Sequence, residues 1–289
     1  MLEAHALTLA HGKAAVVTEA SLTVAPGEIV ALCGPNGAGK STLLAALAGE
    51  LRPRSGRVTI GGADIASLSA PVLAELRAVL EQSPRVSASF SVAMLAGLGI
   101  PRAVPPQRAE AIVAGVLANL ELEALAARPV DHLSGGQQHR AHLARALAQL
   151  AAGRATGRAG YLLLDEPTAS LDLAHQASAM AAARRAARSG AGVVVVLHDL
   201  NLASAFADRI VLLAGGRILI DDTPARVLTE ERLVEVYHAP LKVLPGPGGR
   251  PWVLPVYPVL DADSHPEDPD VARRAPQSCF GDHRLSRRA

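Results

Sequence analysis

The sequence predicts an α/β protein built on a mostly parallel β-sheet. The first observation is a set of short apolar runs at Ile29–Cys33, Tyr161–Leu164 and Val193–Leu197. Strands that are apolar on both faces are typical of a parallel sheet covered by helices. The second observation is that each run ends at a glycine or polar residue. Because ligands gather at the carboxyl ends of such strands, we expect the functional residues there.

Length and composition are consistent with one large domain. The chain has 289 residues, and a large α/β domain can reach about 250 residues as one unit. The formal net charge of +1 argues against a nucleic-acid partner. Cys33 and Cys279 lie far apart, which predicts a reducing compartment without a disulfide framework. No run approaches the roughly 20 apolar residues that span a bilayer, so we expect any membrane role to be peripheral.

Helices are expected between the parallel strands. Lys40–Ala48 follows a glycine-rich stretch, and Gly49 is placed to end it. Residues from about 106 to 128 are rich in Ala, Leu and Glu at helical spacing, and Pro129 closes them. A long Ala/Arg-rich helix is expected at Leu171–Ser189, before a glycine.

Antiparallel strands are expected toward both ends of the chain. Ala20–Ala25 precedes a Pro-Gly pair and predicts an N-terminal hairpin strand. Ile210–Ala214 and Arg217–Ile220 flank two glycines and predict a second hairpin. One short strand is expected at Trp252–Leu254, and the polar, Pro-bearing sequence from about Asp261 onward predicts a disordered tail.

A phosphate-binding loop is the first chemical motif. It matches the pattern GxxxxGK[ST] and consists of Gly34-Pro35-Asn36-Gly37-Ala38-Gly39-Lys40-Ser41. Its glycines let backbone N–H groups curl around phosphate oxygens, and the next helix adds its positive dipole end. Lys40 would neutralise the β- and γ-phosphates, and the Ser41 hydroxyl would bind Mg²⁺. The alternative is a plain glycine-rich turn, but strand, loop and helix stand in the order that the motif requires.

Two acidic residues end the run at Tyr161–Leu164. Asp165 can hold Mg²⁺ beside a phosphate loop, and Glu166 can polarise an attacking water. In isolation this pair indicates only an acidic turn after a strand. Its position far downstream of a phosphate loop makes the motif much more specific.

A third motif, Leu133-Ser134-Gly135-Gly136-Gln137, opens a helix expected to run to about Leu150. Ser134 and Gln137 have the spacing of a capping box, so a helix start explains part of the motif. Capping does not explain the two glycines, because they weaken the first turn. A helix N-terminus with accessible N–H groups is also a good anion site.

With these motifs in this order, the chain resembles the ATPases of ABC transporters, whose signature motif is LSGGQ. The resemblance covers roughly residues 2–257. It identifies Gln82 as the Q-loop glutamine, Asp172 as the D-loop aspartate and His198 as the switch histidine at the γ-phosphate. Considered singly, Gln82 would be a solvated loop residue and His198 a strand-end cap; the ordered context favours the functional roles.

The resemblance implies a P-loop NTPase (RecA-like) core with a mostly parallel sheet, an N-terminal antiparallel β subdomain and an inserted α-helical subdomain. The ATP-binding domain would span residues 1–257, with the helical subdomain at about 83–150 in contact with a membrane partner. Residues 258–289 would form the disordered tail. The tail arginines could contact anionic lipid, but a solvated, dispensable end is the favoured interpretation.

The resemblance further implies ATP and Mg²⁺ as cofactors. The expected catalytic residues are Glu166, His198 and Lys40. The expected metal ligands are Ser41, Gln82 and Asp165. Nucleotide binding would extend along the loop to Thr42. Two copies would pack head to tail, so that the signature residues Ser134, Gly135, Gly136 and Gln137 of one copy act in trans on the other.

The partners implied by the resemblance are integral membrane permease subunits and, indirectly, a periplasmic substrate-binding protein. The chain would be peripheral, on the cytoplasmic face of the inner cell membrane. One position departs from the family pattern. ABC ATPases carry an aromatic residue upstream of the phosphate loop that stacks on adenine, whereas this chain has His11. Its smaller ring predicts weaker stacking, and an ordinary surface residue is an equal alternative.

The cargo is indicated by resemblance alone. His198–Ala203 is similar to importers of iron chelates, haem and cobalamin. The segments most similar to haem (hemin) importer ATPases are Arg77–Gln82, Phe90–Val92 and an insertion at Ala151–Gly160. Glu81 stands where those proteins have proline. After the signature glycines, where Glu-Gln-Gln-Arg is expected, this chain has Gln137-Gln138-His139-Arg140. Hemin uptake is therefore the expected function, with a ferric siderophore or cobalamin importer as the alternative.

Two other classes of protein share parts of this pattern. Soluble ABC ATPases of ribosomes or DNA usually carry two cassettes or a long coiled-coil insertion, and this chain has neither. P-loop kinases and GTPases do not combine LSGGQ with Asp165, Glu166 and His198. Co-purification with a membrane permease would distinguish a transporter subunit from both classes.

Overall fold

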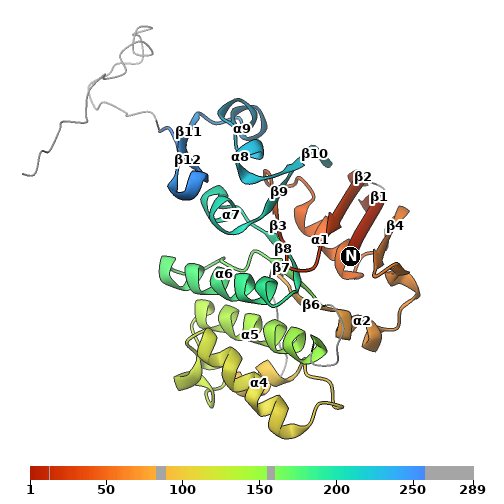
Figure 1. Cartoon of the computed structure of the whole chain (residues 1–289), viewed down its shortest axis with the longest axis vertical. Helices are drawn as coiled ribbons and strands as arrows, with labels where there is room; N and C mark the ends of the chain where they lie inside the picture. Colours follow the sequence, from red (N-terminus) through yellow and green to blue (C-terminus); the bar gives the residue numbers. More distant parts are fainter. Residues whose placement is uncertain (13, 83–88, 155–159, 258–289) are drawn as a thin grey trace, which may run out of the picture. The chain divides into compact units, whose positions relative to one another are not determined.

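The computed structural model describes residues 1–12, 14–82, 89–154 and 160–257. The predicted tail at 258–289 lies outside the described residues. Three β-sheets lie within a unit that spans Met1–Pro255 (Figure 1). The central sheet has the strand order β10-β9-β3-β8-β7-β6. Its strands are β3 (Ile29–Cys33), β6 (Arg77–Leu80), β7 (Tyr161–Asp165), β8 (Gly192–Val196), β9 (Arg209–Ala214) and β10 (Arg217–Asp222).

The central sheet is mostly parallel, as the apolar runs predict. β3 pairs in parallel with β8 and β9, and β7 pairs in parallel with β8 and β6. β10 joins β9 through the predicted antiparallel hairpin. Opposite residues in the registers are Leu32 and Val196, and Asp165 and Val196. The carboxyl ends of β3, β7 and β8 therefore lie level with one another, where the predicted motifs begin.

Two smaller sheets are antiparallel. The N-terminal sheet has the order β2-β1-β4-β5 and confirms the predicted antiparallel subdomain. Its strands are β1 (Leu2–His11), β2 (Ala14–Val24), β4 (Ser55–Ile60) and β5 (Ala63–Asp64). The C-terminal hairpin contains the short strand expected at Trp252–Leu254. It consists of β11 (Leu241–Pro245) and β12 (Pro251–Pro255).

Helices connect the strands. They are α1 (Lys40–Ala48), α2 (Ala70–Leu76), α3 (Val92–Gly97), α4 (Pro106–Asn119), α5 (Gly135–Arg154), α6 (Leu173–Arg188), α7 (Leu200–Phe206), α8 (Pro224–Val227) and α9 (Glu230–Tyr237). Short 3₁₀ turns lie at Ile65–Ser67, Glu123–Leu125, Val130–His132 and Pro247–Gly249. The bounds of α1 are those predicted from the sequence. α3, α4 and α5 pack together beside the central sheet (Figure 1).

Three predicted helix boundaries differ from the structure. α4 stops at Asn119 instead of continuing to about residue 128. Leu120 and Leu122 are both fully buried, and a continuous helix would turn residues two apart toward different sides. α6 begins at Leu173, because Asp172 is its N-cap and accepts a hydrogen bond from the His175 N–H. The α5 helix extends four residues beyond Leu150, to Arg154.

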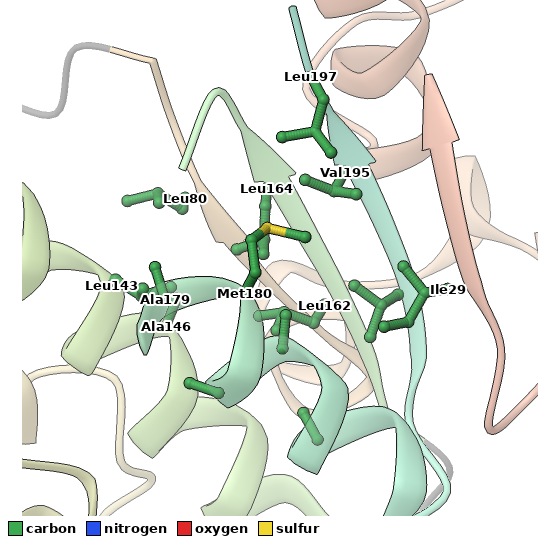
Figure 2. Close-up of a cluster of buried hydrophobic side chains, with 14 of the residues drawn as sticks. Ile29, Leu80, Leu143, Ala146, Leu162, Leu164, Ala179, Met180, Val195 and Leu197 are labelled. Atoms are coloured by element: carbon green, nitrogen blue, oxygen red, sulfur yellow. The ribbon is translucent and has the colours of Figure 1, made fainter. Parts of the chain in front are cut away.

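The core consists of two apolar layers, one on each face of the central sheet. Alternate strand residues point to opposite faces. Ile29, Leu162 and Val195 belong to the layer shared with α5 and α6. Their neighbours along the strands belong to the layer shared with α1 and the N-terminal sheet. Figure 2 shows Met180 of α6 directed at the sheet, next to Leu164.

Replacing Met180 by alanine is expected to lower the free energy of unfolding by about 2–5 kcal/mol, since it leaves a cavity under α6. The Met180 side chain is fully buried. Urea unfolding followed by circular dichroism measures the effect. The matched control is Met94→Ala, because Met94 is 58% exposed and its loss is expected to change stability by about 0.5 kcal/mol or less. Equal losses in the two variants would contradict this assignment of the core.

Candidate active site

The phosphate loop joins β3 to α1 and is shaped by its glycines. Gly34 has a φ of 142°, and a Cβ atom there would lie 2.0 Å from the Leu213 carbonyl oxygen. Gly39 is the N-cap of α1 in a left-handed conformation with φ 98°. A Cβ atom at Gly39 would lie 2.5 Å from Cγ2 of Val17. Both positions therefore require glycine.

A cavity of about 680 Å³ opens at this end of the sheet. It brings together predicted residues from distant parts of the chain. The lining residues are His11, Val16, Asn36, Gly37, Gly39, Lys40, Ser41, Thr42, Gln82, Glu166 and His198. Four other residues predicted in the phosphate loop and the acidic motif are not part of this lining: the carbonyls of Gly34 and Pro35 contact Lys40, Ala38 is buried, and Asp165 contacts Ser41.

Lys40 is held inside the loop. Its Nζ donates hydrogen bonds to the carbonyls of Gly34 at 2.8 Å and Pro35 at 2.9 Å. Burial lowers the pKa of Lys40, while Cys33, Glu166 and Asp165 act in the opposite direction. The ammonium group therefore interacts electrostatically with both acidic residues of the second motif. A phosphate bound in the loop would meet this cation.

Asp165 and Ser41 form the second contact of the site, between residues 124 positions apart in the sequence. The Ser41 hydroxyl donates to Oδ1 of Asp165 at 3.0 Å. Asp165 is the last residue of β7, and burial raises its pKa, whereas the bond from Ser41 lowers it. Gln82, just after β6, is exposed and lines the cavity with Ser41. Hydroxyl, carboxylate and amide oxygens thus gather beside the loop.

Glu166 and His198 meet across the ends of β7 and β8. His198 Nε2 lies 2.6 Å from Oε1 of Glu166. The Glu166 side chain is 16% exposed and that of His198 is 47% exposed, so the carboxylate is the shielded partner. Glu166 has a φ of 51°. Left-handed backbone at a residue other than glycine is strained, and such strain persists where surrounding structure enforces it.

The signature residues open α5, as predicted. The Gln137 N–H donates to Oγ of Ser134 at 3.4 Å, and the Ser134 N–H donates to Oε1 of Gln137 at 3.1 Å. This is the reciprocal capping box that the spacing indicates. Ser134 and Gly135 are exposed. Of the described residues that line the cavity, none belongs to the Ser134–Gln137 motif.

Asp172, the predicted D-loop residue, lies between the acidic motif and α6. Its carboxylate accepts bonds from the backbone N–H of His175 at 2.9 Å and from the His175 ring at 2.7 Å. These bonds lower the pKa of Asp172. Ser170 has a φ of 60°, and a Cβ atom at Gly136 would lie 3.1 Å from its carbonyl oxygen. The D-loop of the chain therefore rests against its own signature helix.

His11 ends β1 at the rim of the cavity. Its Nε2 lies 3.4 Å from the hydroxyl of Thr42, and its ring is exposed. Sequence reasoning missed Val16, which lines the same cavity from β2. The Val16 carbonyl also lies against Gly39 and Gly216. No local pattern marks Val16, because only the packing of β2 on the phosphate loop brings it there.

Comparison with known proteins identifies the class. The family model described as ABC transporter matches residues 17–169. The chain therefore belongs to the ABC transporter family, which confirms the predicted resemblance. It is 46% identical over 254 residues to the hemin import ATP-binding protein HmuV of Rhodopseudomonas palustris, covering 88% of this chain and 94% of that protein. It is 47% identical over 250 residues to the protein of the same name from Bordetella pertussis, covering 85% and 95%.

Solved structures agree with this fold. A metal-chelate type ABC transporter in an inward-facing conformation is 26% identical, with a TM-score of 0.71, covering 89% of this chain and 97% of the other. A bacterial ABC transporter cassette solved as a dimer is also 26% identical, with a TM-score of 0.68 and coverage of 77% and 98%. Within the described part of this chain, no helix has the length and apolar character needed to cross a membrane.

Proposed function

We propose that this chain is the ATP-binding and ATP-hydrolysing subunit of an ABC importer that takes up hemin through separate permease subunits. One observation carries the enzymatic part. Lys40 of the phosphate loop and the Glu166–His198 pair line one cavity, although they come from three distant segments. The cargo is supported by the identity of 46% and 47% to two hemin import ATP-binding proteins.

ATP is the substrate that this cavity suits. Backbone N–H groups of the loop and the first turn of α1 would bind the phosphates, with Lys40 as the cation. Thr42 and Asn36 line the same wall. His11 and Val16 lie on the N-terminal sheet beside this wall, where an adenine ring would pack. Because imidazole offers a smaller π-face than the usual aromatic residue, His11 would hold adenine more weakly.

The donor set beside the loop fits Mg²⁺. In the described residues, no cluster of three or more His, Cys, Asp or Glu side chains is arranged to hold a metal. Mg²⁺ in nucleotide sites instead takes few protein oxygens together with phosphate oxygens and water. Ser41, Asp165 and Gln82 would supply those protein oxygens. The bound ion would neutralise charge on the β- and γ-phosphates.

Hydrolysis would be an in-line attack by water on the γ-phosphorus. Glu166 would accept the water proton while the new P–O bond forms and the bond to the β–γ bridging oxygen breaks, which leaves ADP and phosphate. Lys40 would stabilise charge on the phosphoryl oxygens. His198 contacts the base at 2.6 Å and lines the same cavity, where it would contact a γ-phosphate oxygen of bound ATP.

The site would be completed by a second copy of the chain. The signature residues do not line the cavity of their own chain within the described residues, and Ser134 is exposed. A helix N-terminus with free N–H groups would bind the γ-phosphate of the partner's ATP. A related cassette that was solved as a dimer supports this arrangement. ATP binding would close the dimer and hydrolysis would reopen it.

Replacing Ser134 by arginine is expected to leave ATP binding by the single subunit intact and to abolish ATP-dependent dimerisation. The long charged side chain would occupy the space that the partner's nucleotide needs. Equilibrium ATP binding and gel filtration with ATP measure the two steps separately. Ser69→Arg is the control, because Ser69 is exposed and lies just before α2, outside the signature helix. A normal dimer of Ser134→Arg would count against the action in trans.

The membrane partners follow from the family. ABC ATPases of importers dimerise and pair with permease subunits, and one similar structure is an ABC transporter of the metal-chelate type in an inward-facing conformation. We place the chain as a peripheral homodimer on the cytoplasmic face of the inner membrane. The expected partners are the permease and, indirectly, a periplasmic substrate-binding protein, with no nucleic acid.

Reconstitution with the permease tests the proposal. The subunit and its permease are placed in proteoliposomes with the binding protein, and ATP hydrolysis is measured with hemin, a ferric siderophore or cobalamin. Hemin is expected to stimulate ATP use and to be transported. Stimulation by the siderophore or cobalamin alone would contradict hemin as the cargo, but it would still support the role as a transporter ATPase. ATP hydrolysis without any permease association would overturn the transporter role.

A further inference from the structure

The outer edge of β6 is bound by a helix instead of a strand. In the described part of the chain, β6 is the last strand of the central sheet, and the groups on its outer edge need other partners. Arg145 of α5 donates from Nη2 to the Val79 carbonyl at 3.0 Å. Gln149 of α5 donates from Nε2 to the carbonyls of Arg77 at 3.2 Å and Ala74 at 2.9 Å. α5 therefore takes the place of a neighbouring strand.

The spacing of these side chains matches the spacing of the carbonyls. Arg145 and Gln149 are four residues apart, which is about 6 Å along a helix. Arg77 and Val79 are two residues apart, which is about 6.6 Å along a parallel strand. The contact thus defines a register between helix and strand. A shift of α5 along β6 would break both bonds together.

Charge strengthens the same contact. Burial lowers the pKa of Arg145, and the carboxylates of Glu81 and Glu50 oppose this effect. Glu81 lies directly after β6 and directly before Gln82, which lines the ATP cavity. The guanidinium group of Arg145 is therefore attracted to the start of the Q-loop as well as bonded to β6.

β6 is also joined to the phosphate-binding helix. Nε of Arg77 donates to the Ala48 carbonyl, the last residue of α1, at 2.6 Å. A cation at the C-terminus of a helix is favourable because of the helix dipole. β6 therefore contacts α1, which begins at Lys40, and α5, which begins at the signature motif (Figure 1).

We propose that Arg145 and Gln149 are positioning residues that keep the signature end of α5 in a fixed relation to Gln82. The inference rests on the proposed function, since only the ATP-sandwich dimer uses the signature residues in trans. Arg145 lies ten residues beyond Gly135, about 15 Å along one rigid helix. Through the bonds of Arg145 and Gln149 to β6, the position of Gln82 at the cavity would be coupled to the signature residues that meet the partner's nucleotide.

Apolar variants of similar volume test this proposal in the Glu166→Gln background, which is expected to accumulate the ATP-bound dimer. Arg145→Met and Gln149→Met remove the bonds to β6 and keep much of the packing. The ATP concentration needed for dimerisation is expected to rise by about tenfold. This factor corresponds to the free energy that one hydrogen bond, or one from a charged donor, contributes. The Kd of the single subunit for ATP is expected to stay within about twofold of the parent value. Arg145→Lys retains a donor and is expected to restore most of the dimerisation.

Arg232→Met is the matched control. Arg232 donates to the carbonyls of Arg226 and Val227, so its loss also removes two bonds to backbone, but away from β6. It is expected to dimerise like the parent. Normal dimerisation of both Arg145→Met and Gln149→Met would overturn the inference alone. If the variants lose dimerisation but also unfold at lower urea concentration and bind ATP more weakly, the effect is purely structural and the inference is wrong. Failure of the Glu166→Gln parent to dimerise would overturn the proposed function and this inference with it.

Discussion

Glu166→Gln is expected to bind ATP as the parent chain does, to hydrolyse it about 100-fold more slowly or worse, and to accumulate as a dimer. Glutamine keeps the shape of the side chain and can still contact His198, but it cannot accept the proton of the attacking water. The ATP-bound dimer then forms and does not reopen. Phosphate release in a single turnover measures the first effect, and gel filtration with ATP measures the second.

Glu121→Gln is the matched control for this experiment. Glu121 also has a left-handed backbone, with a φ of 55° against 51° for Glu166, but it lies beyond the end of α4. The control therefore separates loss of the carboxylate from a change in backbone strain. It is expected to hydrolyse ATP at the parent rate. Parent-like hydrolysis by Glu166→Gln would rule out Glu166 as the general base.

The second large effect is expected from Lys40→Ala, which should abolish tight ATP binding. Lys40 is the buried cation of the loop, at 2.8 Å and 2.9 Å from two loop carbonyls. Without it, the phosphates face carbonyl oxygens and the carboxylates of Asp165 and Glu166 with no compensating side chain. Affinity is expected to fall by at least about 100-fold, because close charge pairs contribute several kcal/mol. Calorimetric titration with ATP measures the loss.

Lys242→Ala controls for the loss of one positive charge, since Lys242 is exposed on β11. It is expected to bind ATP as the parent does. Urea unfolding of Lys40→Ala checks that the fold persists. It measures any change in the stability of this variant independently of its ATP affinity. Tight ATP binding by a folded Lys40→Ala variant would contradict the proposed role of Lys40 in phosphate binding.

Local features were predictable because their physics lies within a few consecutive residues. The bounds of α1 follow from Lys40 to Gly49, where glycines flank a short apolar helix. The capping box of Ser134 and Gln137 needs only a spacing of three. The apolar runs predicted the parallel strands, since burial on both faces leaves no polar positions. Each of these depends on the chain within one turn or one strand.

The end of α4 was not predictable in this way. Ala, Leu and Glu continue past Asn119, so composition does not mark a stop. In the fold, the carbonyl of Leu120 accepts a hydrogen bond from Arg140 of α5 at 3.0 Å. Burial of both Leu120 and Leu122 then favours a turn over a continued helix. The helix ends because of a contact from another helix, and the sequence near residue 120 does not contain that information.

The sequence alone determined the family, the parallel sheet and the order of the motifs, because these depend on local residue patterns. Tertiary structure decided which of those residues meet. It brings Ser41 to Asp165 and His198 to Glu166, across 124 and 32 positions of sequence. It also adds Val16 to the cavity and sets α5 on the edge of β6. The physical reason is that a pattern specifies the chemistry of each segment, whereas distances between segments come only from packing the whole core.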